Sequence, residues 1–149
     1  MDQAERTTII AKVTQLLARR EHSVVELTDK LVGKGFARES VMNIISEFSA
    51  KNIQSDYRYV ESRVRNAMRR GIGPMRVNAE LKQHKVNSDL FTQVENEIQP
   101  DWFELAKEVK HKRFGEIAES DLKLRYKQQQ FLSYRGFSVE QIKYAMSGE

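Results

Sequence analysis

The side chains best suited to catalysis or metal binding are few and scattered along the chain. There are three histidines, His22, His84 and His111, and no cysteine. No histidine lies three or four residues from another, so the ligand spacing of a zinc site is missing. His22 stands beside Ser23, a pair that would suit a nucleophile and its base. A helix-capping serine next to a surface histidine is the interpretation we favour.

The chain also lacks a motif for holding a nucleotide. The turn at residues 71–74 is rich in glycine but has no Lys-Ser or Lys-Thr pair to hold phosphate and magnesium. Carboxylates alternate with lysines and arginines, as they do on solvated helical surfaces. We therefore expect no catalytic residues, no metal, no cofactor and no enzymatic activity.

An arginine-rich segment at residues 57–70 is the most distinctive chemical feature. Its apolar residues recur at helical spacing, while arginines occupy the opposite face and one flank. Only Glu61 offsets them, so we expect this face to be unpaired. Guanidinium groups suit clamps on phosphate or carboxylate, so this is either a partner-binding surface or an ordinary solvated helix face. The candidates are Arg58, Arg63, Arg65, Arg69 and Arg70, extended by Arg76 in the following helix.

A second basic region lies in the last third of the chain. Its first part holds Lys107, Lys110, Lys112 and Arg113 among several glutamates. Lys123, Arg125 and Lys127 follow, and ordinary surface charge is the interpretation we favour for the whole region. The later candidates for partner or DNA binding are Lys123, Arg125, Lys127 and Arg135, the last beside an exposed Tyr134.

The elements that must position these residues are helices. Apolar residues recur at three- and four-residue intervals, and the alternation typical of strands is absent. Ser23 and Glu26 form a capping-box pattern, in which the glutamate would reach back to the serine backbone. Ser138 and Gln141 form a second one. Gly35 suits the left-handed geometry that ends a helix.

The helical pattern repeats. Leu31, Leu81 and Leu132 are about fifty residues apart, and each is followed by a helix stop, a polar helix start and an apolar pair. Lys85 replaces glycine at the middle stop. Gln128 stands where the other two units have Leu27 and Val77.

We predict an all-α fold of three tandem three-helix repeats, packed into an elongated, curved molecule. The expected divisions are residues 1–53, 54–99 and 100–149. Trp102 and Phe103, at the start of the third repeat, are expected to pack between repeats.

Charge and hydropathy restrict the partners. Lys and Arg number 25 against 21 Asp and Glu, a net charge of +4, which permits a nucleic acid or an acidic partner without requiring one. No apolar run is long enough to span a membrane, and the first residues lack the apolar core of a signal peptide. We expect a cytoplasmic protein.

Several fragments, in order and spacing, resemble the bacterial RecX regulatory family along essentially the whole chain. They are LLARREHS at 16–23, SDYRYVES at 55–62, RRGIGP at 69–74 and FLSYRGFS at 131–138. The chain departs from the family at Lys85 and at the glutamines of 128–130, where the family tends to be basic. That departure weakens any filament or DNA contact assigned to the segment before Phe131.

The resemblance implies a non-enzymatic modulator of the RecA recombinase. Such a protein binds the RecA nucleoprotein filament and limits its growth, ATP hydrolysis, strand exchange and co-protease activity. Single-stranded DNA is an expected further partner and double-stranded DNA an open one; a monomer is expected. Two other hypotheses remain: a helix-turn-helix DNA-binding regulator, and a passive helical scaffold.

Overall fold

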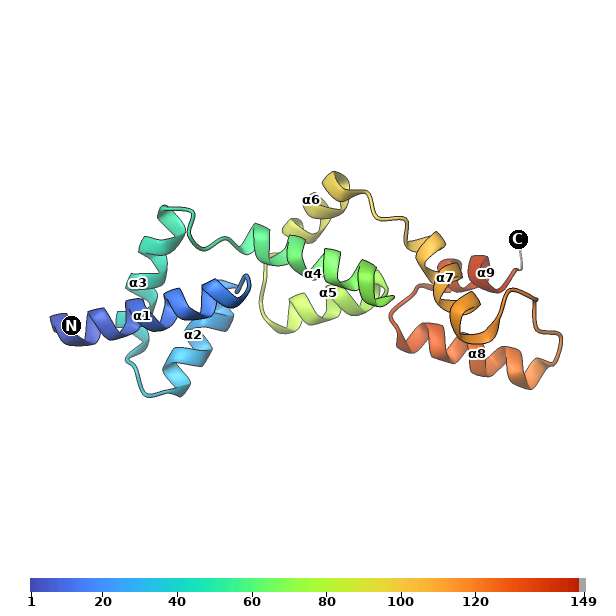
Figure 1. Ribbon diagram of the computed structural model, residues 1–149, viewed down its shortest axis with the longest axis horizontal. Coiled ribbons are helices and arrows are strands. Elements are labelled where there is room, and N and C mark those ends of the chain that lie inside the picture. The colour runs from blue at the N-terminus through green and yellow to red at the C-terminus, as the bar shows by residue number, and fades with distance from the viewer. Residues whose placement is uncertain (148–149) are drawn as a thin grey trace.

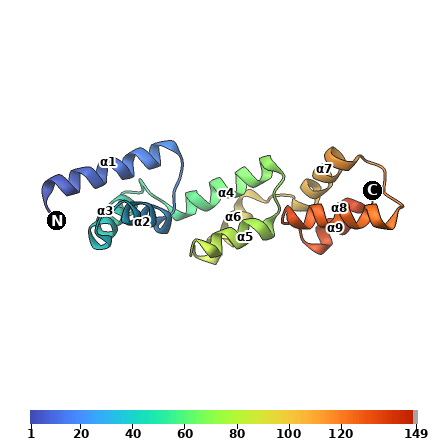
Figure 2. The ribbon, with the colours of Figure 1, turned by 90° about the horizontal axis from the view of Figure 1, so that it is seen from below.

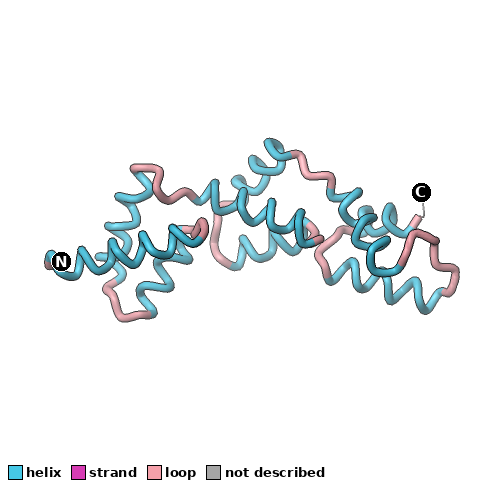
Figure 3. Tube along the Cα trace, viewed as in Figure 1, coloured by secondary structure: helices cyan, strands magenta, loops and turns pink. Residues whose placement is uncertain are grey.

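The computed structural model describes residues 1–147, which form nine α-helices and no strand (Figures 1 and 3). The helices are α1 (Gln3–Arg19), α2 (Val24–Gly33), α3 (Arg38–Ala50), α4 (Asp56–Arg70), α5 (Pro74–Gln83), α6 (Ser88–Ile98), α7 (Trp102–Phe114), α8 (Leu122–Tyr134) and α9 (Val139–Met146).

The helices form three units in a row. We call α1–α3 the first unit, α4–α6 the second and α7–α9 the third. Two perpendicular views show the elongated arrangement, with the N-terminus and the third unit at opposite ends (Figures 1 and 2). The extensive helix–helix contacts all lie within units. The predicted all-α, three-repeat architecture is confirmed, whereas the exact divisions at 53/54 and 99/100 stay a proposal. The last two residues of the third division lie outside the described residues.

Each unit has a hydrophobic core of its own. The first is built on Ile9, Leu31 and Ile44, the second on Val60, Leu81 and Val94, and the third on Ala106, Leu132 and Ala145. The repeated leucines Leu31, Leu81 and Leu132, which we call the landmark leucines, are therefore core residues. A unit of this size buries little surface alone, so contacts between neighbours matter for its stability.

One core crosses between units. Trp102 begins α7 but is buried in the core of the second unit, where its Nε1 donates a hydrogen bond to Glu95 at 2.8 Å. Packing between repeats is thus confirmed for this residue. The same expectation is wrong for Phe103, which is 44% exposed and makes an edge-on contact with Tyr144 of its own unit. The two neighbours differ because successive helical residues point about 100° apart.

The second helix of every unit ends in the same way. The residues after the helix cap, Gly35, Lys85 and Gly136, all have positive φ, at 101°, 57° and 100°. The next backbone N–H then bonds back to the landmark leucine carbonyl, at 3.2, 3.0 and 3.2 Å. This is the Schellman motif, in which an apolar residue after the turn covers the helix end. The predicted left-handed stop at Gly35 is confirmed, and Lys85 adopts it despite its Cβ.

Side chains cap most helix N-termini. Ser138 and Gln141 form the complete reciprocal capping box that the sequence predicts. The corresponding box at Ser23 is half right. The Ser23 hydroxyl accepts from the Glu26 N–H at 3.1 Å, but the Glu26 carboxylate pairs with Arg20 at 2.6 Å instead of returning to the cap.

His22, in the loop before Ser23, is buried. His22 is 2% exposed, so its interpretation as a surface histidine is wrong. Its Nδ1 lies 3.0 Å from the Arg20 carbonyl oxygen, and its Nε2 lies 3.3 Å from the Lys30 ammonium. The carbonyl only accepts and the ammonium only donates, so the ring is neutral with its proton on Nδ1.

This loop also joins the first unit to the second. The Gln54 amide, itself buried, donates to the His22 carbonyl at 3.1 Å, and the Val24 N–H donates to the Asp56 carboxylate at 2.9 Å. Arg58 forms an ion pair with Glu21 across the same boundary, with 2.9 Å between Nε and Oε1. Side-chain hydrogen bonds therefore hold these two units together.

No helix in the described part of the chain is both long and apolar enough to cross a membrane.

Candidate functional site

The candidate site lies where the second and third units meet, and backbone contacts build that junction. The Gly73 N–H donates to the Arg135 carbonyl at 2.8 Å, and the Met75 N–H donates to the Gly136 carbonyl at 2.9 Å. A Cβ on Gly73 would lie 2.4 Å from the Gly136 carbonyl oxygen. Only glycine allows the two chain segments to come this close.

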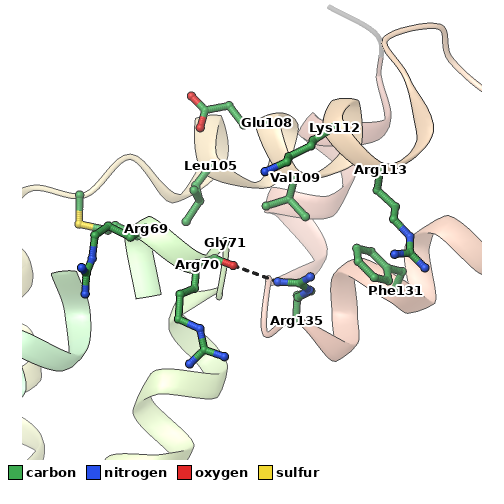
Figure 4. Close-up of a pocket in the computed structure, with 11 residues that line it drawn as sticks. Arg69, Arg70, Gly71, Leu105, Glu108, Val109, Lys112, Arg113, Phe131 and Arg135 are labelled. Carbon is green, nitrogen blue, oxygen red and sulfur yellow. Dashed lines mark hydrogen bonds between the residues drawn. The ribbon is translucent and has the colours of Figure 1, made fainter. Parts of the chain in front are cut away.

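A pocket of about 440 Å³ opens beside this contact, between the end of α4, the outward face of α7 and the end of α8 (Figure 4). We call it the junction pocket. Its lining is Met68, Arg69, Arg70, Gly71, Leu105, Glu108, Val109, Lys112, Arg113, Phe131 and Arg135.

Five of the lining residues are cations, and all come from helix C-terminal ends. Arg69 and Arg70 are in the last turn of α4, Lys112 and Arg113 in the last turn of α7, and Arg135 is the C-cap of α8. Cations are favoured there because the helix dipole leaves partial negative charge on the final carbonyls. The junction brings three such ends to one place.

These five cations lack carboxylate partners. Among residues 1–147 none of them makes an ion pair, although Glu108 also lines the pocket. The Arg69 guanidinium donates a hydrogen bond to the Asn66 amide oxygen, at 3.1 Å. The pocket therefore carries a local excess of positive charge, which favours an anionic ligand.

Hydrogen bonds and ring contacts fix the α8 side of the pocket. Arg135 donates to the Arg70 carbonyl at 3.0 Å, the dashed line in Figure 4. The guanidinium groups of Arg113 and Arg135 lie over the ring of Phe131, with distances of 4.9 and 5.1 Å to its centre. Two cations thus share one ring.

The predicted arginine surface divides in this structure. Two of its members, Arg69 and Arg70, line the junction pocket together with Arg135, a candidate from the last third of the chain. The expectation that the arginines of this surface are unpaired is wrong for its other members, three on α4 and one on α5. Arg58 pairs with Glu21 at 2.9 Å, Arg63 with Glu80 at 2.9 Å, Arg65 with Glu61 at 3.9 Å and Arg76 with Glu80 at 3.6 Å.

Most of these carboxylate partners come from other helices or loops. Glu61 is on the same helix and is evident from the sequence, whereas Glu21 precedes α2 and Glu80 is on α5. Glu80, which pairs with Arg63 and Arg76, lines a second, small hollow of about 30 Å³, and Arg70 lines it too without an ion pair. Arg76 also lies over the Tyr134 ring, 5.7 Å from its centre, and Tyr134 is 78% exposed, as predicted.

The α8 candidates lie apart from the pocket. Lys123 and Arg125 lie in the first turn of α8 and Lys127 near its middle, and none of them lines the junction pocket. The structure does not bring them together with the α4 arginines.

Two cations that we interpret from the sequence as ordinary surface charge line the junction pocket. Lys112 and Arg113 line the junction pocket, and their position in the last turn of a helix is the signal that could have singled them out. Lys110, of the same basic group, is not on the surface at all but fully buried. Its ammonium donates to the Gly115 and Ile117 carbonyls at 2.8 and 3.0 Å, so it holds the α7–α8 loop.

Within residues 1–147 no cluster of His, Asp and Glu side chains is placed to hold a metal ion.

Comparison with known proteins assigns the chain to a family. A family model described as the RecX second three-helix domain matches residues 55–94, and one described as the RecX third three-helix domain matches residues 99–146. The regulatory protein RecX of Vibrio parahaemolyticus is 41% identical over 135 residues, covering 91% of this chain and 87% of that protein. The chain belongs to the RecX family.

Other RecX proteins are also similar to this chain in sequence or in fold. The regulatory protein RecX of Legionella pneumophila is 38% identical over 131 residues, covering 86% of this chain and 85% of that protein. A crystal structure of RecX from Lactobacillus salivarius has a TM-score of 0.78 at 18% identity, covering 97% of this chain and 96% of that one. A second RecX crystal structure has a TM-score of 0.79 at 20% identity, covering 97% and 74%. The relatives are named regulatory proteins, and a regulatory role follows for this chain.

Proposed function

We propose that this protein binds the RecA recombinase filament and inhibits its extension, ATP hydrolysis, strand exchange and co-protease activity. The observation that carries the proposal is membership of the RecX family over about nine-tenths of the chain. The protein acts by binding, in the cytoplasm and as a monomer, and has no reaction of its own.

The arrangement of the surface supports a binding role. Five cations without carboxylate partners among the described residues surround one pocket, so an anionic surface of the filament gains charge pairs there without breaking existing ones. The elongated row of units offers a long face to such a partner (Figure 2). Single-stranded DNA in the filament is a further proposed contact, and double-stranded DNA a weaker one.

The test is ATP hydrolysis by the recombinase of the same cell on single-stranded DNA, titrated with this protein. We expect inhibition at well below one protein per recombinase monomer, because limiting filament growth affects many subunits. No inhibition at saturating protein contradicts the proposal. Tight, sequence-dependent binding to bare DNA in the control then favours the helix-turn-helix regulator.

Single variants locate the contact. Arg69→Ala and Arg65→Ala each remove one exposed arginine of α4, but only Arg69 lines the junction pocket. We expect Arg69→Ala to weaken inhibition and Arg65→Ala to weaken it less, with helicity unchanged in both by circular dichroism. Equal, undiminished inhibition by both variants removes this helix from the proposed filament contact.

A further inference from the structure

The junction pocket has two kinds of surface. Four of its five cations are exposed, while the half-buried side chains of Met68, Leu105 and Val109 provide aliphatic surface inside it. Figure 4 shows Leu105 and Val109 on α7 facing the end of α4. A ligand that fits both must combine negative charge with an aliphatic or aromatic group.

This combination favours a peptide over a nucleic acid strand. Single strands are held by phosphate contacts and by bases stacked on aromatic faces. Among the described residues that line the pocket, Phe131 alone has an aromatic ring, and the guanidinium groups of Arg113 and Arg135 lie over it. Phe114 meets the same ring edge-on at 5.4 Å. The pocket thus offers aliphatic surface to a side chain and no open ring to a base.

The charges indicate acidic residues beside that side chain. The guanidinium groups of Arg113 and Arg135 both lie over the Phe131 ring, and neither is paired with a carboxylate among residues 1–147. Two like charges this close repel each other. An incoming carboxylate relieves this repulsion, and the exposed side chains of Arg70 and Lys112 offer further donors. Glu108 disfavours a second acid at its own edge of the pocket.

We propose that the junction pocket binds a short acidic segment of a partner protein, with one apolar side chain between Met68, Leu105 and Val109. Carboxylates on either side of that side chain pair with Arg70, Lys112 and Arg113. The volume of about 440 Å³ matches one large side chain with its flanking backbone. The inference rests on the proposed function only for the identity of the partner, which is then the recombinase.

The test measures binding of a labelled synthetic peptide by fluorescence anisotropy. In the probe, one phenylalanine is flanked on both sides by aspartates; in the comparison peptide, serine replaces the phenylalanine. We expect the phenylalanine peptide to bind more tightly. The double variant Arg70→Gln/Lys112→Gln should weaken its binding about tenfold, as expected for losing two exposed charge pairs.

A matched control removes the same charge elsewhere. Lys34 and Lys51 are exposed and lie in the first unit, at the ends of α2 and α3. The double variant Lys34→Gln/Lys51→Gln should leave peptide binding unchanged. Equal weakening by both double variants, or equal affinity for both peptides, overturns the proposal in favour of non-specific charge attraction.

An oligothymidylate probe distinguishes the other class of ligand. If it binds in a way that needs Arg70 and Lys112 while the acidic peptide does not bind, the pocket is a phosphate site and the proposal is wrong. Peptide binding needs no recombinase, so the two proposals fail separately. Inhibition without peptide binding contradicts only the pocket's ligand, and peptide binding without inhibition contradicts only the recombinase function.

Discussion

Arg63 and Arg69 lie on the same helix but differ in what they can bind. Arg63 is paired with Glu80 at 2.9 Å, whereas Arg69 donates to a neutral amide oxygen. A partner must break or share the first pair but meets the second cation without competition. The availability of a surface arginine thus depends on carboxylates that reach it from other helices.

Gln128 provides a test of a single buried residue. Its side chain is 7% exposed and its Oε1 has no hydrogen-bond partner among residues 1–147, at a position where the other units place Leu27 and Val77. Because a buried unsatisfied oxygen is costly, we expect Gln128→Leu to raise the free energy of unfolding by about 1–2 kcal/mol. Urea denaturation measures the change.

The control lies on the same helix. Gln130 is exposed, so Gln130→Leu should change stability by less than about 0.5 kcal/mol. A loss of stability in Gln128→Leu would show that the amide is satisfied in solution.

His22 makes stability depend on pH. Burial lowers its pKa, and the nearby Arg20 and Lys30 charges add to this, partly offset by the Arg20 carbonyl and Glu26. A histidine with a lowered folded-state pKa binds its proton more readily when unfolded. The stability it contributes is therefore present above its ordinary pKa of about 6.5 and is lost as the pH falls below it.

The measurement compares urea midpoints at pH 8 and pH 5.5. We expect the native protein to lose stability over this range and His22→Gln to lose less. An identical pH dependence in the two proteins would contradict a buried, neutral His22.

At the level of elements, the helix stop decides where each unit turns. The same Schellman motif ends the second helix of all three units, although only two of them have glycine at the left-handed position. The motif survives at Lys85 because Val86 still bonds back to Leu81, which is itself buried in the core.

Lys85→Gly tests the cost of the lysine at that position. Lys85 has a φ of 57°, where a Cβ is unfavourable, so we expect glycine to raise stability by about 0.5–1 kcal/mol. Lys34 is the matched control, since its φ is −89° and Lys34→Gly only adds freedom to the unfolded chain. Thermal melts should move in opposite directions, and a shared direction would contradict this account.

Across the whole molecule, the two junctions differ in kind. Side-chain hydrogen bonds around Gln54 and Asp56 link the first and second units. Backbone hydrogen bonds and the contact of Gly73 with Gly136 link the second and third. The second junction tolerates no added atom, and the proposed binding pocket depends on it.

Gly73→Ala tests that dependence. Gly73 has an ordinary φ of −84°, so the substitution tests space alone, and its Cβ would meet backbone atoms at 2.4–2.5 Å. We expect a loss of about 1–3 kcal/mol in stability, as for overpacking elsewhere. Weaker binding of the acidic peptide should accompany it, because the pocket opens with the junction.

Gly33→Ala is the matched control. Gly33 lies in the last turn of α2, and no atom lies within 4 Å of the place that a Cβ would take. Gly33→Ala should therefore raise the free energy of unfolding by up to about 1 kcal/mol. Denaturation of both variants measures the difference. Unchanged stability in Gly73→Ala would contradict a close-packed junction.

The helices, their stops and the threefold repeat follow from the amino-acid sequence alone. These features depend on local spacing and caps, so the pattern is enough to assign Leu31, Leu81 and Leu132 to the cores in which they lie. The sequence also indicates α4 as a basic surface and carries the resemblance to the RecX family.

Which cations are available depends on the tertiary fold. Glu21 and Glu80 neutralise arginines that are distant in sequence, and no spacing rule predicts such pairs. The junction of Gly73 with Gly136 then brings three helix ends together, which assembles Arg70, Lys112 and Arg135 into one pocket. The sequence determines which residues are charged. Whether a cation is paired with a carboxylate depends on the distance between them in space, and only the fold sets that distance.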